Sequence, residues 1–161
     1  MIDSKKISKV DEASKQFIID VLEGNQTHGI DIECIYYNQK KIWIVIEFCK
    51  CDTLDPFSSH PNNYPFNWRK FVTLFEISQK LGGELWIINY SLKEQWRNNI
   101  RLLNIRGVDY ALVNQLIKSQ TQPRGYVGYL KYEDNRMSLT DFKSFFKDLN
   151  NKASNVWEDK L

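Results

Sequence analysis

The sequence of 161 residues predicts a single domain of the mixed α/β class, in which helices pack against a mixed sheet. Three observations predict this class. Hydrophobic residues make up 42% of the chain, and no polar low-complexity run interrupts them. Segments with helical periodicity alternate with segments of strand periodicity. A chain of this length buries roughly 70% of its unfolded surface, so one core is expected over residues 1–161.

The N-terminal half predicts the order helix, strand, strand, helix, strand. Apolar residues recur every three or four positions in the helical segments, whereas the first strand alternates and the second is apolar on both faces. Asn67 offers a cap for the second helix, and Gly82-Gly83 offers the left-handed residue that ends it. The elements are expected over residues 11–23, 29–37, 41–51, 68–81 and 84–90.

The C-terminal half predicts further strands and a terminal helix. Ser138 and Asp141 are spaced as a capping box ahead of an amphipathic segment, and the chain beyond Asn151 is expected to fray. Tyr126 and Tyr129 occur at strand spacing and are interpreted as core or half-buried sheet residues without a chemical role. The expected elements are a helical turn over residues 91–94, a strand over 100–106, a helix over 109–119 and a strand over 125–132.

Charge and hydropathy restrict the partners and the compartment. The chain has 22 basic and 20 acidic residues, so it lacks the global positive field of a polybasic protein, and any contact with nucleic acid must be local. No apolar run approaches the length of a membrane span, and the segment Met1–Val10 is polar without a signal core. The sequence therefore predicts a cytoplasmic protein that does not bind a membrane.

The cysteine pattern predicts thiols without a metal. Cys34, Cys49 and Cys51 are odd in number, and they are expected to be reduced and buried. The two histidines, His28 and His60, do not have the spacing of a zinc site, so no zinc is expected.

Two carboxylates stand out because the predicted hairpin brings them together. Asp31 lies near the start of the first strand, and Glu47 lies near the end of the second. A turn centred on Asn38-Gln39 would place Asp31 opposite residue 46 and beside Glu47. Neighbouring carboxylates on an apolar sheet repel each other, and a cation between them relieves this repulsion. Mg²⁺ suits such a site because it binds one or two carboxylates together with water and phosphate.

The segments Gly29-Ile30-Asp31 and Ile46-Glu47-Phe48-Cys49-Lys50 resemble the motif of the PD-(D/E)XK nuclease superfamily. The resemblance covers residues 11–90 and implies a restriction-endonuclease-like core of helix, antiparallel strand meander, helix and strand. Residues 91–151 would then form a C-terminal extension. The resemblance also implies that Asp31 and Glu47 bind the metal and that a lysine activates or orients the attacking water.

Two departures from the family pattern concern the first acid and the lysine. No proline precedes Asp31, and Lys50 lies three residues past Glu47, where the family has a spacing of two. On a regular strand Lys50 would point away from Glu47, so it reaches the site only through a β-bulge. The family also accepts a lysine from the following helix, which nominates Lys70.

The resulting hypothesis is a Mg²⁺-dependent endonuclease, a hydrolase of phosphodiester bonds, with Asp31, Glu47 and Lys50 as its catalytic residues. Mn²⁺ would serve in place of Mg²⁺. The expected partner is nucleic acid, with DNA favoured over RNA, and the chain would act as a homodimer or in a larger complex. The second hypothesis is a catalytically altered nuclease-like domain that binds nucleic acid or a protein without turnover. The third is an unrelated α/β fold with ordinary surface acids.

A contact with nucleic acid is expected at the start of the second helix. Trp68, Arg69 and Lys70 lie in its first turn, where backbone N–H groups and basic side chains suit a phosphate and an aromatic ring suits a base or sugar. The alternative is a Trp68 in the core with two solvated basic neighbours. His60, which precedes a proline in the adjacent loop, is either a turn residue or a contact with the substrate.

Overall fold

The computed structural model describes residues 16–17, 20–23, 30, 32–119 and 125–158. The chain divides into two compact units, residues 1–31 and residues 32–161. In the first unit, residues 16–17 and 20–22 are helical and Glu23 is in a turn. Residues 11–15 and 18–19 of the expected helix lie outside the described residues. Within the described ranges, no helix combines the length and the apolar character that crossing a bilayer requires.

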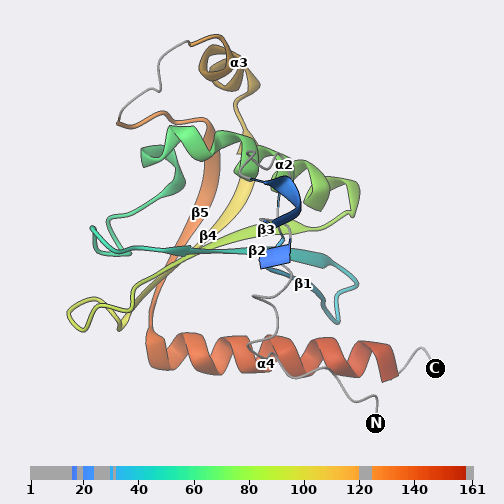
Figure 1. The fold of residues 1–161 in the computed structure, drawn as a ribbon. Coiled ribbons are helices and arrows are strands. Elements are labelled where there is room, and N and C mark those ends of the chain that lie inside the picture. Colours follow the sequence, from blue (N-terminus) through green and yellow to red (C-terminus); the bar gives the residue numbers. More distant parts are fainter. Residues whose placement is uncertain (1–15, 18–19, 24–29, 31, 120–124, 159–161) are drawn as a thin grey trace. The chain divides into compact units, whose positions relative to one another are not determined.

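A five-stranded mixed sheet forms the centre of the second unit (Figure 1), which confirms the predicted mixed class. Strands β2 and β3 are parallel, because helix α2 returns the chain to the same end of the sheet, and every other neighbouring pair is antiparallel. The strands lie side by side in chain order, as β1 (Cys34–Tyr37), β2 (Trp43–Lys50), β3 (Glu84–Tyr90), β4 (Asn99–Val108) and β5 (Leu130–Ser138).

Helices α2 (Trp68–Lys80) and α4 (Leu139–Glu158) cover opposite faces of the sheet, and α3 (Tyr110–Lys118) connects β4 to β5 (Figure 1). Strand β2 alternates between the two faces. Its Ile44 and Ile46 belong to the apolar cluster that packs against α4, and Val45 and Glu47 point to the face that α2 covers. All four are buried, as the near-continuous apolar run predicted.

The hairpin between β1 and β2 corrects the predicted register. Ile46 pairs with Cys34, and not with Asp31 as a turn at Asn38-Gln39 requires. The loop is longer than predicted because Asn38 exchanges backbone hydrogen bonds with Ile42 and Lys41, and the Asn38 side chain also accepts from the Ile42 N–H. Lys41 adopts a left-handed conformation with φ of 60°, which closes this loop.

The C-terminal elements differ from the prediction at β5 and α4. The strand covers Leu130–Ser138 instead of residues 125–132, because an edge strand with a solvated face lacks the apolar alternation that marks a strand in a sequence. Tyr126 therefore precedes the strand and is 66% exposed, which corrects its assignment to the sheet. Helix α4 continues to Glu158 instead of fraying after residue 151.

One capping prediction is confirmed in this half, and the structure adds a second cap. The Ser138 hydroxyl accepts from the backbone N–H of Asp141 and donates to its carboxylate. Helix α3 lies within the predicted range, and the Asp109 side chain caps it by accepting from two backbone N–H groups. The segment over residues 91–98 has no helix, and β4 follows it as predicted.

Helix α2 begins and ends close to the predicted residues. Asn67 occupies the N-cap position, but its side chain makes no capping hydrogen bond, since two 3₁₀ turns, η1 (Pro61–Asn63) and η2 (Pro65–Asn67), lead directly into the helix. At the other end Gly82 has φ of 66°, which confirms the left-handed residue after the helix.

Candidate functional site

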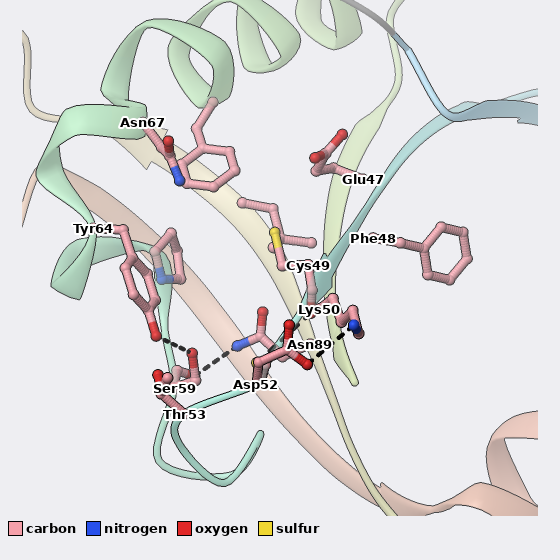
Figure 2. A pocket seen from close by; sticks show the side chains of 14 residues that line it. Glu47, Phe48, Cys49, Lys50, Asp52, Thr53, Ser59, Tyr64, Asn67 and Asn89 are labelled. Carbon is pink, nitrogen blue, oxygen red and sulfur yellow. Dashed lines mark hydrogen bonds and ion pairs between the residues drawn. The ribbon is translucent and has the colours of Figure 1, made fainter. Parts of the chain in front are cut away.

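A cavity of about 350 Å³ lies where β2 and β3 end (Figure 2). The first turn of α2 borders it through Asn67 and Phe71, and the loop after β2 borders it through Asp52, Thr53 and Ser59. Because parallel strands bring their carboxyl ends to one edge of a sheet, ligands of open α/β sheets commonly bind in this position. The cavity is therefore the candidate functional site.

Glu47 supplies the buried charge at this cavity. It lies in the middle of the sheet on β2, it is 5% exposed, and it lines the cavity. The ammonium of Lys70 on α2 lies 2.7 Å from Glu47 Oε1. A buried carboxylate requires such a partner, since removing it from water alone costs several kcal/mol, in the range of about 3–5. The structure therefore brings together the predicted acid and the lysine of the following helix.

Lys50 also lines the cavity, but its side chain lies apart from Glu47. The pairing of β2 with β3 is regular from Ile44 to Lys50, so the bulge that would turn Lys50 toward Glu47 is absent from this ladder. By strand alternation its side chain leaves the sheet on the face opposite Glu47, and it forms an ion pair of 3.1 Å with Asp52 (Figure 2). Both partners of this pair are exposed to solvent.

Asp31, the first predicted metal ligand, lies outside the described residues. A different acid becomes a candidate with the observed register. The ladder ends at the Cys34–Ile46 pair, and continuing it by one residue would place Glu33 opposite Glu47. Burial raises the pKa values of Cys34 and Cys49, and the negative charges of Glu33 and Glu47 raise them further. Glu33 was visible in the sequence, since it shares a strand face with Asp31, but the predicted register did not select it.

Cys49 occupies the position two residues after Glu47, where the superfamily motif has its lysine. It points toward the cavity, whereas its neighbour Phe48 points away (Figure 2). Burial, and after it the charge of Glu47, raises the pKa of the Cys49 thiol to about 12, so this side chain stays neutral. The three cysteines are free thiols, as predicted.

The remaining predicted contacts lie at the start of α2. The Arg69 guanidinium lies over the ring of Trp68, with 5.8 Å from Cζ to the ring centroid, and Arg69 is exposed while Trp68 is half-buried. Lys70, the third residue of the predicted contact, is directed to Glu47 instead of to solvent. Only Arg69 and Trp68 therefore form a surface pair.

A hydrogen-bond network that the sequence does not reveal holds the loop after β2 against the sheet. The Ser59 carbonyl accepts from the side chains of Asn89 on β3 and Arg101 on β4. Arg101 is 5% exposed and also forms two hydrogen bonds with the carboxylate of Asp134 on β5. These partners lie 30 to 42 residues apart in the chain, so no local pattern could indicate them.

The chemistry of the described residues is that of one buried carboxylate with an ammonium beside it in a polar cavity. Among these residues no group of three or more His, Cys, Asp or Glu side chains could hold a metal ion. Mg²⁺ requires fewer protein ligands, because it commonly binds one or two carboxylates and retains several waters. The donor chemistry of Glu47 therefore fits this ion.

Comparisons of the chain with family models, curated proteins and solved structures find no match. The geometry of the cavity and the residues that line it therefore carry the proposed function.

Proposed function

We propose that the chain is a Mg²⁺-dependent nuclease domain of the PD-(D/E)XK type, with Glu47 as a metal ligand and Lys70 as the lysine of the motif. The observation that carries this proposal is the contact of 2.7 Å between Lys70 Nζ and Glu47 Oε1 beside the cavity. A lysine on the helix satisfies the requirement for a cation next to the second acid, at a position where the strand itself has Cys49.

Lys70 suits this role better than Lys50 because of its surroundings. Lys70 is 29% exposed and adjoins a buried carboxylate, whereas Lys50 is 45% exposed and pairs with an exposed one. An ammonium has three donors, so it can hold a water molecule in hydrogen-bond contact while it stays near Glu47. Positioning that water near the phosphodiester is the role that we assign to Lys70.

Glu47 would hold the metal, and Glu33 is a further candidate because continuing the β1–β2 register by one residue would place it opposite Glu47. When bound, Mg²⁺ would supply Lewis-acid polarisation of the phosphodiester. The residues of the chain would orient the substrate and exclude bulk water, since the cavity lies between helix α2, the strand ends and the loop over residues 51–60.

The test compares single variants of the two lysines and of the acid. Protein free of contaminating nucleases is incubated with DNA and RNA, single-stranded and duplex, in Mg²⁺ or Mn²⁺. Glu47→Gln and Lys70→Gln are each expected to lower the cleavage rate at least about a hundredfold, because each removes a group that acts on the reacting atoms. Lys50→Gln is the matched control and should retain the rate of the wild-type protein.

Equal loss in Lys50→Gln and Lys70→Gln would contradict the assignment of the lysine. Equal cleavage by wild-type protein and Glu47→Gln would contradict the site as a whole. The second hypothesis, binding without turnover, is favoured by one observation, the presence of Cys49 at the motif's lysine position. It predicts that nucleic acid binds to the wild-type protein and is not cleaved in either metal.

A further inference from the structure

An aromatic cluster joins the loop after β2 to β5 and the segment that precedes it. It consists of His60, Tyr126 and Tyr132, which we call the His60 platform. The ring centroid of His60 lies 5.3 Å from that of Tyr126 and 6.0 Å from that of Tyr132. Tyr126 is 66% exposed, which is unusual for a large ring held by tertiary contacts.

The segment that carries Tyr126 is held in place instead of moving freely over the surface. Asn62, which is 1% exposed, accepts from the Leu130 N–H and donates to the Leu130 carbonyl, both at 3.0 Å. The Val127 N–H donates to the Asn62 carbonyl at 2.8 Å. These bonds join the segment before β5 to the 3₁₀ turns at residues 61–67, which run beside it in Figure 1. The exposed ring is therefore pre-positioned.

The charge of the buried Arg101 acts on His60 and Tyr132 of the platform, and Arg136 lies four residues beyond Tyr132 on β5. Every second residue of β5 points to the same face, and one face therefore carries Tyr132, Asp134 and Arg136. Arg136 lies over the ring of Phe57, with 5.7 Å from Cζ to the ring centroid. Asp134 is shared between Arg136 and the buried Arg101, so two guanidinium groups face one carboxylate. Arg136 is 53% exposed, so its guanidinium is accessible to an anionic ligand.

The platform is close to the candidate active site. Ser59 and Pro61 flank His60 in the chain, and both line the cavity. Burial lowers the pKa of His60, and the charge of Arg101 lowers it further, so the imidazole is neutral at pH 7 and behaves as an aromatic ring. A ligand that bridges the cavity and the platform therefore meets polar groups at one end and aromatic rings with an arginine at the other.

From this arrangement we infer that the His60 platform binds an unpaired base of a single-stranded nucleic acid whose phosphodiester occupies the cavity. Aromatic rings next to arginine form the usual surface for single strands, because every base has a face that can stack, whereas the bases of a duplex are already stacked on each other. This inference rests on the proposed function and extends it by naming the substrate as single-stranded, or as a duplex with a single-stranded flank.

The test measures binding separately from cleavage. A fluorescein-labelled single strand of about 12 nucleotides, within the range of site sizes on single-strand-binding domains, is titrated with the full chain in EDTA. The same sequence as a duplex is titrated in parallel. The single strand should bind more tightly, and Tyr126→Leu should weaken its binding about fivefold or more, since one stacked base is lost. Arg136→Gln should reduce the slope of log binding constant against log salt concentration by about 0.7, because one contact with a phosphate is lost.

The matched controls are an exposed tyrosine and an exposed lysine away from the platform. Tyr110→Leu, on α3, and Lys147→Gln, on α4, should leave the affinity for the single strand and its salt dependence unchanged. Equal affinities of Tyr126→Leu and Tyr110→Leu for the single strand would overturn the inference. A loss of affinity of Tyr126→Leu for the duplex as large as its loss for the single strand would also overturn it. EDTA suppresses metal-dependent cleavage, so the binding result does not depend on whether the protein is a nuclease. A failure of the proposed function would appear as absent cleavage in the separate assay with Mg²⁺ or Mn²⁺.

Discussion

Among the single residues, Glu47 is unfavourable for the stability of the sheet, because it places a carboxylate in the buried interior. Its neighbours on the same face, Val45 on its own strand and Ile87 directly opposite on β3, are apolar and fully buried. A buried ion pair is often no more stable than apolar residues of the same volume, so the pair of Glu47 and Lys70 adds little to folding. The proposed role of Glu47 as a metal ligand gives a reason for its presence that packing does not.

The stability of the Glu47–Lys70 pair depends on which partner is removed. Lys70→Met should lower the free energy of unfolding by about 2 kcal/mol, because it leaves a carboxylate of 6% exposure without the nearby cation. Glu47→Gln should cost less, since the remaining ammonium is 29% exposed and regains water. Urea denaturation at pH 7 measures both values.

The exposed pair of Lys50 and Asp52 provides the control for this prediction. Lys50→Met should change the free energy of unfolding by less than about 0.5 kcal/mol, because solvent screens an exposed pair. A larger loss of unfolding free energy in Glu47→Gln than in Lys70→Met would contradict the prediction for the Glu47–Lys70 pair.

At the scale of elements, helix α2 and the turn after it determine the geometry of the site. The first turn carries Lys70 to Glu47, and the last leads through Gly82 and Gly83 into β3. The Gly83 N–H donates to the Ser78 carbonyl at 2.8 Å, and the next residue already pairs with β2. This short connection sets the parallel register that aligns the ends of β2 and β3 at the cavity.

The two glycines of this turn should differ in their tolerance of a side chain. A Cβ atom on Gly83 would lie 2.0 Å from the Trp43 carbonyl oxygen, so Gly83→Ala should lower the free energy of unfolding by about 2–3 kcal/mol. Gly82→Ala meets no atom within 4 Å and should cost about 1 kcal/mol, from its left-handed φ alone. Thermal and urea denaturation measure both losses of unfolding free energy. A larger loss in Gly82→Ala than in Gly83→Ala would contradict this prediction.

At the scale of the whole described unit, Arg101 joins the candidate site to the far edge of the sheet. From the buried middle of β4 it donates to the carbonyls of Phe57 and Ser59 and to the carboxylate of Asp134 on β5. Asn99 on the same strand donates to Asp55 in the loop. The loop that borders both the cavity and the His60 platform is therefore positioned by β4 and β5.

The Arg101–Asp134 pair should make stability depend on pH in the acid range. The hydrogen bonds from Arg101 hold the pKa of Asp134 below its ordinary value of 3.8. A carboxyl with a lowered folded-state pKa stabilises the fold above its unfolded pKa, and this contribution is lost as the pH falls through the folded value. Asp134→Asn should lower the free energy of unfolding by roughly 2 kcal/mol at pH 7 and flatten its decline below about pH 4.

Glu133 is the matched control, since it lies next to Asp134 in the chain. Arg106 also lowers its pKa, through a contact of 2.7 Å, but this carboxylate is exposed and solvent screens the pair. Glu133→Gln should therefore change the unfolding free energy at pH 7 less than Asp134→Asn does. Identical pH profiles for wild-type protein and Asp134→Asn would contradict the proposed contribution of this pair.

Elements with local signals could be predicted from the amino-acid sequence. Hydrophobic periodicity marks α2 and β3, the Asp109 and Ser138 side chains cap the helices that follow them, and the apolar run of β2 predicts a strand buried on both faces. Each of these features depends on residues a few positions apart, so a single chain segment carries all the information that is needed.

The tertiary structure alone decided which distant groups meet. The loop at Asn38 shifted the hairpin register from Asp31 toward Glu33, and the crossover helix brought Lys70 to Glu47. The hydrogen bonds of Asn62 placed Tyr126 on the surface instead of in a strand. Spacing in the sequence could not predict these contacts, because they depend on loop lengths and on the packing of a helix over a sheet, which no local pattern encodes.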